Sequence, residues 1–356
     1  MPELPEVETI RIGLARLLPG QVIADVWHDW QKSFPNAPAD VARFMVGAKI
    51  QSVRRRAKVL IIELSSEYSL VIHLKMTGQL VFRGKVSFGA GHPTDSLIGE
   101  LPDKSTRVII EFYGDKKPRD LRLDTMQGKG EQQTKPYLTY GKGAAQPLTP
   151  QRAKSVVGVS GRQPGQQDDT AHGPRLFFND QRKFGWMRLL PTVEVPEINF
   201  MQKVGPEPLE DDFTVDKFIN NILRRRQSAI KAVLLDQTVL AGVGNIYADE
   251  SLWAAKIHPI MLAGQIPRTK LIKLYSELRR ILAMAIAKGG STDRNYVNAK
   301  GKRGSYLEFA QVFRQNGQPC PRCGTEIIKI RVAGRGTHIC PRCQIDRSQK
   351  TKDRKK

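Results

Sequence analysis

Two pairs of cysteines near the C-terminal end constrain the fold of this chain more than any other feature. Each pair has the form Cys-x2-Cys, and residues 324–339 separate the two pairs. Two such pairs at this separation form a zinc pattern, in which four thiolates complete a tetrahedral site and leave no position for water. We therefore predict one structural Zn²⁺ and no catalytic metal, with the ligands Cys320, Cys323, Cys340 and Cys343.

The residues between the cysteine pairs have the pattern of a β-hairpin. Strand-like runs at Glu326–Val332 and Thr337–Ile339 flank a glycine-rich turn at residues 334–336. Arg335 in this turn would stand beside the metal, where it could reach a phosphate or a groove. His338 is not expected to be a ligand, because four thiolates already satisfy the metal.

A large positive charge indicates a polyanionic partner. The chain has 57 basic and 35 acidic residues, which give a formal net charge of +22. In a compact fold this excess repels itself unless a partner neutralises it, and nucleic acid is the commonest such partner. A basic solubility tail is the alternative, but Lys and Arg are spread along the whole chain.

The sequence contains no recognisable membrane or export segment. No uncharged apolar run approaches the roughly 20 residues that a membrane span requires. The first residues are acidic, at Glu3 and Glu6, where a secretory signal would be basic. We therefore expect no membrane partner and a cytoplasmic location, whose reducing conditions favour metal binding over disulfides.

The first part of the chain has a helix followed by strands. The helix begins near Pro5 with an apolar stripe, and Pro19-Gly20 is expected to end it. Seven short runs rich in β-branched and aromatic residues follow, which favours an all-β sandwich or barrel. The runs are Val22–Trp27, Leu60–Leu64, Leu70–His73, Gln79–Phe82, Arg107–Phe112, Arg175–Phe178 and Trp186–Leu190.

Two polar stretches interrupt this strand pattern. Residues 114–174 are dominated by Gly, Gln, Lys, Pro and Asp, which is typical of a flexible insertion. Residues 84–105 have the composition of a second long loop.

From about Glu207 the pattern becomes helical, and a glycine-rich turn precedes one helix. Gly242 and Gly244 allow a close backbone approach there, and Asn245 is a candidate N-cap that would leave backbone N–H groups facing a phosphate. An ordinary loop between helices explains these glycines equally well. The predicted helices are Asp216–Arg225, Ala229–Leu235, Ala248–Ala255 and Thr269–Lys288.

Position 2 offers a nucleophile. Because this residue is small, an aminopeptidase can remove Met1 and expose the secondary amine of Pro2. An α-amino group has a pKa near 8, roughly two units below that of Lys, so much more of it is neutral at pH 7. It can attack a sugar C1′ and form a Schiff base, with Glu3 beside it as a general acid or base. Taken alone, a helix-capping N-terminus without chemistry is the better interpretation.

Three motifs occur together, in one order. They are Pro2-Glu3-Leu4-Pro5-Glu6-Val7-Glu8, the turn Gly242–Glu250 and the four-cysteine finger. In this combination the chain resembles the formamidopyrimidine-DNA glycosylase family, over roughly residues 1–115 and 175–345. The resemblance implies a multidomain α+β fold with an N-terminal β-sandwich and its leading helix at 1–200, a helix–two-turns–helix domain at 205–300, a zinc finger at 309–345 and a basic tail at 346–356.

The resemblance also implies a function in base-excision DNA repair. Such an enzyme is a bifunctional glycosylase and abasic-site lyase, which removes 8-oxoguanine and formamidopyrimidines from double-stranded DNA and cleaves the strand by β,δ-elimination. The damaged nucleotide is flipped out of the base stack. A monomer associated with a bacterial-type nucleoid is implied as well.

Four residues match the catalytic positions of the family. Pro2 matches the nucleophile, and Glu3 matches the residue that protonates the deoxyribose ring oxygen. Lys58 matches the lysine assigned to β-elimination, for which a phosphate contact at a strand start is the alternative. Arg335 matches the arginine of the zinc finger that is tied to δ-elimination and phosphate binding.

Five further residues match DNA-contacting positions. Met76 matches the residue that fills the void left by the flipped base. Arg182 would contact the orphaned cytosine, and Phe184 would wedge the base step. Asn245 and Arg226 match phosphate contacts. Without the resemblance, Met76 and Phe184 would be interpreted as core residues.

Two positions and one segment depart from the family pattern. Lys75 stands where the family usually has Gly, which places a charge near the void-filling loop. Ser105 stands where a DNA-contacting His is common, so that contact is in doubt. The insertion at residues 114–174 lies outside the resemblance.

Two other functions remain open at this point. An endonuclease VIII-like enzyme for oxidised pyrimidines typically has Gly in place of Leu4 and lacks the pair Arg182 and Phe184. A non-catalytic DNA-binding protein on the same scaffold would be expected to lose Pro2, Glu3 or Lys58.

Overall fold

The computed structural model describes residues 2–92, 94–114, 173–290 and 306–345. The predicted insertion lies almost wholly outside these residues, as does the predicted basic tail. Among the described residues, no helix is both long and apolar enough to cross a membrane.

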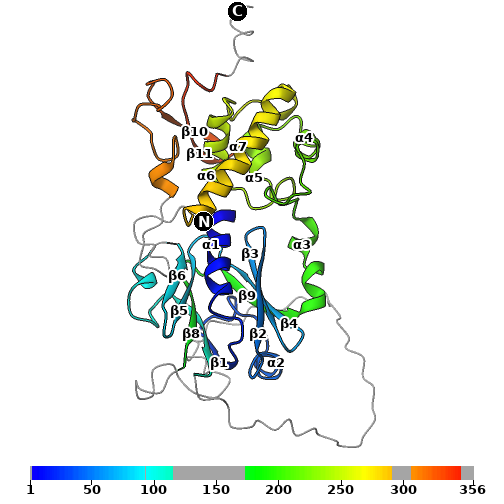
Figure 1. Ribbon diagram of the computed structural model, residues 1–356, viewed down its shortest axis with the longest axis vertical. Helices are drawn as coiled ribbons and strands as arrows, with labels where there is room; N and C mark the ends of the chain where they lie inside the picture. Colours follow the sequence, from blue (N-terminus) through cyan, green and yellow to red (C-terminus); the bar gives the residue numbers. More distant parts are fainter. Residues whose placement is uncertain (1, 93, 115–172, 291–305, 346–356) are drawn as a thin grey trace, which may run out of the picture.

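Two antiparallel sheets form a sandwich in the first part of the chain (Figure 1). The five-stranded sheet has the spatial order β1 (Ile23–His28), β7 (Thr106–Phe112), β8 (Arg175–Asp180), β5 (Gly78–Arg83) and β6 (Phe88–Gly91). The four-stranded sheet has the order β2 (Ile50–Arg56), β3 (Val59–Leu64), β4 (Tyr68–His73) and β9 (Trp186–Pro191).

Alternation along the strands explains why the two sheets pack face to face. Leu70 and Ile72 of β4 point into the core shared by both sheets, whereas Val71 between them joins a small cluster on the outer face. Successive side chains of a strand point to opposite faces, so a strand buried on both faces is apolar throughout. This is the pattern of the run Val59–Ile62 in β3, which is apolar and buried throughout.

Helix α1 (Leu4–Ala15) joins the sandwich to the rest of the chain. Val7, Ile10 and Leu14 are buried in the sandwich core. The helix contacts β2 and β6, which are each an edge strand of one sheet. Its N-terminal end lies beside α7 (Figure 1). The first residues of the chain are therefore held between the sandwich and the helices.

The remaining helices precede a hairpin that carries the cysteines. Short segments α2 (Pro38–Phe44), η1 (Asp95–Leu97), η2 (Thr192–Glu197) and α3 (Asn199–Lys203) accompany the sandwich. The helical region, as we call it, contains α4 (Val215–Leu223), α5 (Ile230–Leu235), α6 (Asn245–Ala254), η3 (Ala263–Gln265) and α7 (Arg268–Ala287). The finger follows η4 (Tyr306–Phe309) and consists of β10 (Ile328–Val332), β11 (Arg335–Ile339) and the four cysteines. The helical region and the finger share one hydrophobic core, which includes Cys320 and Cys340.

All seven predicted strands and all four predicted helices of the helical region are present, with small shifts at their ends. Three details were predicted wrongly. The first helix ends at Ala15, before Pro19-Gly20. Residues 84–105 contain strand β6 as well as loops, and the edge strand β2 was not predicted.

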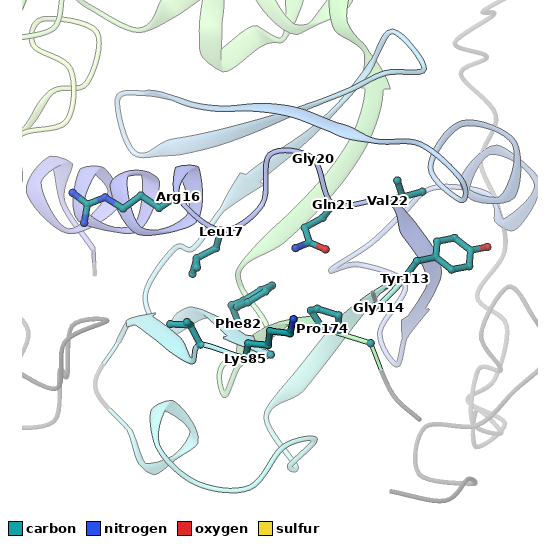
Figure 2. A pocket seen from close by; sticks show the side chains of 13 residues that line it. Arg16, Leu17, Gly20, Gln21, Val22, Phe82, Lys85, Tyr113, Gly114 and Pro174 are labelled. Atoms are coloured by element: carbon teal, nitrogen blue, oxygen red, sulfur yellow. The ribbon is translucent and has the colours of Figure 1, made fainter. Parts of the chain in front are cut away.

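A pocket of about 600 Å³ opens at the far end of α1 (Figure 2). Leu17, Phe82 and Pro174 line it beside Lys85. Arg16 at its rim follows Glu3 by 13 residues, which corresponds to roughly 20 Å along a helix. The pocket is therefore separate from the N-terminal carboxylates.

Candidate active site

Glu3 lies at the start of α1, and its carboxylate reaches the helical region. Its Oε1 accepts a hydrogen bond of 3.1 Å from the N–H of Ile246, in the first turn of α6. The backbone N–H of Glu3 donates to Oε2 of Glu6 at 2.8 Å, which fixes the start of α1. Oε2 of Glu3 is buried without a hydrogen-bond partner among the described residues. A buried acceptor without a partner is suited to meet a bound ligand.

The glycine-rich turn receives the start of α1. The N–H of Leu4 donates to the carbonyl oxygen of Gly242 at 3.0 Å. Gly242 has a φ of +79°, and a Cβ atom there would lie 2.6 Å from the Leu4 side chain. This position therefore requires glycine both for its backbone conformation and for the close approach. Gly244 is the N-cap of α6, so the prediction that Asn245 caps this helix was wrong.

The pKa of the Glu3 carboxyl is raised to about 7. Burial is the main cause, and the negative charge of Glu6 adds to it. The ammonium of Lys58 and the N–H of Ile246 act in the opposite direction. Near neutral pH this carboxyl group therefore holds a proton in a large fraction of molecules, as a general acid requires.

Lys58 lies in the turn between β2 and β3 and is 5% exposed. Its Nζ donates to the carbonyl oxygen of Val243 at 2.9 Å. Burial lowers the pKa of Lys58, although the charges of Glu3 and Glu6 raise it. A lysine with a lowered pKa can exchange a proton more readily near neutral pH.

A buried carboxylate holds the turn that carries Lys58. The residue before it, Ala57, has a φ of +53°, and its N–H donates to Oε1 of Glu207. Glu207 also pairs with Arg55, whose Nη1 lies 2.8 Å from its Oε2. The Nε of Arg55 lies 2.8 Å from Oε2 of Glu8 in α1. These bonds connect β2, α1 and the segment before α4, and so they fix Lys58 relative to Glu3.

Pro2 directly precedes Glu3 and is buried. As the residue before Glu3, it lies at the start of α1 beside the N-terminal carboxylates, whose charges act on Lys58. The structure thus brings together three of the four predicted catalytic residues.

The fourth, Arg335, is the first residue of β11 and is exposed. The hairpin turn is formed by Ala333 and Gly334, both with positive φ, rather than by residues 334–336 as predicted. The positive charge of Arg335 lowers the pKa of Lys58, so the two charges lie near enough to interact.

A buried ion pair docks the finger onto the helical region. Nζ of Lys231 in α5 lies 2.6 Å from Oδ1 of Asp249 in α6, and both side chains are completely buried. Lys231 also donates to Oγ1 of Thr337 at 2.6 Å, and Asp249 accepts the N–H of His338 at 2.9 Å. The amide of Asn245 donates to the carbonyl oxygen of Gly336 at 3.0 Å. These contacts hold β11 and thereby position Arg335.

The four predicted cysteines lie together. Their Sγ atoms are all within 4.8 Å of one another, and the pair Cys323–Cys340 is at 3.4 Å. Sulfur atoms bound tetrahedrally to one zinc at about 2.3 Å lie at roughly such separations. The cluster therefore fits one zinc ion. His338 is not part of the cluster, as predicted.

Met76 and Phe184 are exposed apolar residues on neighbouring turns of the sandwich. Met76 is 39% exposed and Phe184 is 50% exposed, so the interpretation of either as a core residue is wrong. The Nη1 of Arg182 lies 3.3 Å from the sulfur of Met76, and its guanidinium lies 4.8 Å from the centre of the Phe184 ring. Arg226 is exposed between α4 and α5.

Comparison with known proteins decides the family. Three family models match in succession: the formamidopyrimidine-DNA glycosylase N-terminal domain at residues 1–127, its H2TH domain at 204–296, and the zinc finger found in FPG and IleRS at 317–345. The formamidopyrimidine-DNA glycosylase of Streptococcus pyogenes is 35% identical over 348 residues, which cover 98% of this chain and 100% of that protein. The chain belongs to the formamidopyrimidine-DNA glycosylase family.

Solved structures of the family agree with this assignment. A Lactococcus lactis FPG mutant in complex with DNA containing Fapy-dG has a TM-score of 0.71 at 30% identity, and the match covers 97% of this chain and 100% of that one. The L. lactis Fpg in complex with DNA containing an abasic site gives the same TM-score at 29% identity, with the same coverage. The predicted fold class, zinc site and class of enzyme are confirmed.

The sequence interpretation missed several residues that support the candidate active site. Lys231 and Asp249, which dock the finger, and Glu207, which holds the turn of Lys58, were not singled out. Neither was Tyr247, whose hydroxyl donates to Oε1 of Glu6 at 2.5 Å. One signal was available, because Lys231 is the single charged residue in the apolar run Ile230–Leu235.

Proposed function

We propose that this chain excises oxidised purines from duplex DNA and then cleaves the resulting abasic strand. The observation that carries the proposal is the Glu3 carboxyl group. It is buried beside Pro2, its pKa is raised to about 7, and its Oε2 has no hydrogen-bond partner among the described residues. A proton donor in this state is what ring opening of a deoxyribose requires.

The first step uses the amine of Pro2 after removal of Met1. The nitrogen forms a bond to C1′ of the damaged nucleotide, and the bond from C1′ to the base breaks with its electron pair leaving on the base, which takes up the proton that the amine nitrogen releases. Glu3 gives its proton to the ring oxygen, so the sugar opens and an iminium links Pro2 to C1′. Before Met1 is removed, the Pro2 nitrogen is an amide and cannot react.

Lys58 and Arg335 serve the strand cleavage that follows. The iminium makes the C2′ proton acidic, and loss of this proton expels the 3′ phosphate. Lys58 is buried between the carboxylates and the Val243 carbonyl, with a lowered pKa that suits proton transfer. Arg335 stabilises the phosphate that leaves in the second, δ-elimination.

Five further residues bind the duplex around the flipped nucleotide. Met76 fills the void, Phe184 wedges the base step, and Arg182 contacts the base left without a partner. Their exposure and mutual contacts support this arrangement. Arg226 and Asn245 each contact a phosphate, and the amide of Asn245 also donates to the carbonyl oxygen of Gly336 in the finger.

We infer the organisation of the whole chain on the same basis. The catalytic domain extends over residues 1–200, the helix–two-turns–helix domain over 205–300 and the finger over 309–345. The protein acts as a monomer on the chromosome, in a bacterial-type nucleoid. Its net charge of +22 supports a DNA partner.

Borohydride trapping tests the proposal. The protein, with N-terminal sequencing to verify that Pro2 is exposed, is reduced in the presence of duplex DNA containing 8-oxoguanine opposite cytosine. A covalent adduct is expected with the wild type, and its yield should fall strongly in Glu3→Gln, which keeps the shape of the side chain. Absence of an adduct with the processed wild type rejects the proposal and leaves a DNA-binding protein without this chemistry. Trapping only on thymine glycol would instead indicate the enzyme class that acts on oxidised pyrimidines.

A further inference from the structure

Lys75 adopts a backbone conformation that favours glycine. Its φ is +51°, in the turn between β4 and β5. A side chain at such a position clashes with its own backbone, so residues with a Cβ atom occur there mainly where the surroundings hold them. Here the N–H of Lys75 donates to Nδ1 of His73 at 3.0 Å, and the N–H of Gly78 donates to the carbonyl oxygen of Leu74 at 2.9 Å. The turn is therefore fixed, and a lysine occupies it despite the unfavourable conformation.

The ammonium of Lys75 has no carboxylate partner among the described residues: none of the ion pairs or side-chain hydrogen bonds found there involves it. Its side chain is half-buried. Burial, the charge of Lys75 and the charge of Lys58 together lower the pKa of His73 to about 3, so His73 is neutral and adds no further positive charge. A half-buried positive charge without a partner is suited to an anionic ligand.

The place of Lys75 indicates which anion this is. It directly precedes the exposed Met76, and, like the buried Lys58, it lies near enough to His73 for its charge to lower the pKa of that imidazole. Both neighbours belong to the proposed site for the flipped nucleotide. Ser105, where a DNA contact was in doubt, is buried, and its Oγ donates to Asp103 at 2.7 Å, so it faces the protein.

We propose that Lys75 binds a backbone phosphate of the damaged strand next to the flipped nucleotide. The inference rests on the proposed function for the identity of the ligand. The charge contact between Lys75 and the phosphate would hold the damaged strand beside Met76 while the nucleotide is flipped out of the base stack.

The salt dependence of DNA binding tests the contact. The probe is a duplex with a tetrahydrofuran abasic analogue, which cannot be cleaved, so binding is measured independently of catalysis. Loss of one phosphate contact lowers the slope of log Kobs against log salt by about 0.9. We expect this decrease for Lys75→Gly, which removes the charge and suits the local φ, and we expect no decrease for Lys75→Arg.

Lys49 provides the matched control. It is exposed at the opposite end of β2 from Lys58, so Lys49→Ala should leave the slope unchanged. An unchanged slope in Lys75→Gly, or an equal decrease in Lys49→Ala, overturns the proposal. Failure of the wild type to form a borohydride adduct would reject the proposed chemistry without changing this binding result.

Neutral methylphosphonate linkages locate the phosphate. Two probes carry one such linkage, on the 3′ or on the 5′ side of the abasic analogue. On one of them Lys75→Gly should bind as tightly as the wild type, because the partner of the lysine is already missing. If the substitution weakens binding to both neutral probes as much as to the charged one, the proposal is wrong.

Discussion

The side chain of Glu3 occupies the space that a Cβ atom at Gly244 would need. Such an atom would lie 2.2 Å from Cδ of Glu3 and 2.4 Å from its Oε1. Gly244 has an ordinary negative φ of −133°, so its backbone does not require glycine. The absence of a side chain at this position serves the close packing of the carboxylate against the start of α6.

The substitution Gly244→Ala should therefore displace Glu3 and slow base excision. Because a positioned general acid contributes about 100-fold or more, we expect at least this decrease in the single-turnover excision rate. Gly47→Ala is the control, since Gly47 has a φ of +80° with open space around it. It should lower Tm through backbone strain and leave excision intact. Equal excision rates in Gly244→Ala and the wild type would contradict the role of this contact.

The pKa of Glu3 predicts a falling limb in the pH dependence of excision. Glu3 with a pKa of about 7 loses its proton as pH rises, whereas the Pro2 amine, with an ordinary pKa near 8, becomes reactive. The single-turnover rate should pass through a maximum between about pH 7 and pH 8 and then fall. A rate that rises steadily through pH 9 would exclude Glu3 as the acid.

The same raised pKa predicts an effect on stability. Between its ordinary pKa of 4.5 and about 7, Glu3 binds more protons in the folded protein than in the unfolded one. Its contribution to stability is therefore full below 4.5 and is lost as pH rises through about 7. Glu3→Gln cannot ionise, so its Tm relative to the wild type should increase from pH 5 to pH 8. A difference in Tm that stays constant over this range would show that the Glu3 pKa is not raised.

Most of the sandwich could be predicted because its inner strands carry unbroken apolar patterns. The two missed strands, β2 and β6, lie at the edges of their sheets. β2 ends in three consecutive arginines, which suggest a solvated segment, but Arg55 is neutralised by Glu8 and Glu207 from elsewhere in the chain. β6 has two glycines in four residues, which weakens any strand pattern. In both cases tertiary contacts outweigh local preference.

The proposed active-site residues could be named from motifs, but their chemical state could not. Glu3 and Ile246 are 243 positions apart in the chain, so no local pattern shows that they meet. The raised pKa of Glu3 and the lowered pKa of Lys58 both arise from burial between the sandwich and the helical region. The docking of the finger through Lys231 is likewise a long-range contact, visible beforehand only as one charge in an apolar helix.

Removal of zinc should separate the finger from the rest of the protein. Cys340 is a proposed ligand and also part of the core shared with the helical region. Cys340→Ser should abolish zinc binding, lower Tm and weaken DNA binding at least tenfold, because metal binding and folding are coupled in such sites. Arg335→Ala is the control, since it removes the proposed DNA contact and should retain one zinc per chain. Full zinc content in Cys340→Ser would show that this cysteine is not a ligand.

The buried pair Lys231–Asp249 should stabilise the protein mainly by avoiding an unpaired charge. Asp249→Asn leaves the Lys231 ammonium buried alone and should cost about 3–5 kcal/mol in the free energy of unfolding. The double variant Lys231→Met with Asp249→Leu removes both charges and should recover most of this loss, because apolar replacement of a buried pair is often neutral. It also removes the hydrogen bonds to Thr337 and to the N–H of His338 that hold β11. The double variant should therefore be stable to denaturant and yet bind abasic-site DNA more weakly, since Arg335 is no longer positioned. Unfolding free energies and DNA affinities of Lys231→Met, Asp249→Leu and the double variant test this, and a double variant that loses as much stability as the sum of these two single variants would contradict it.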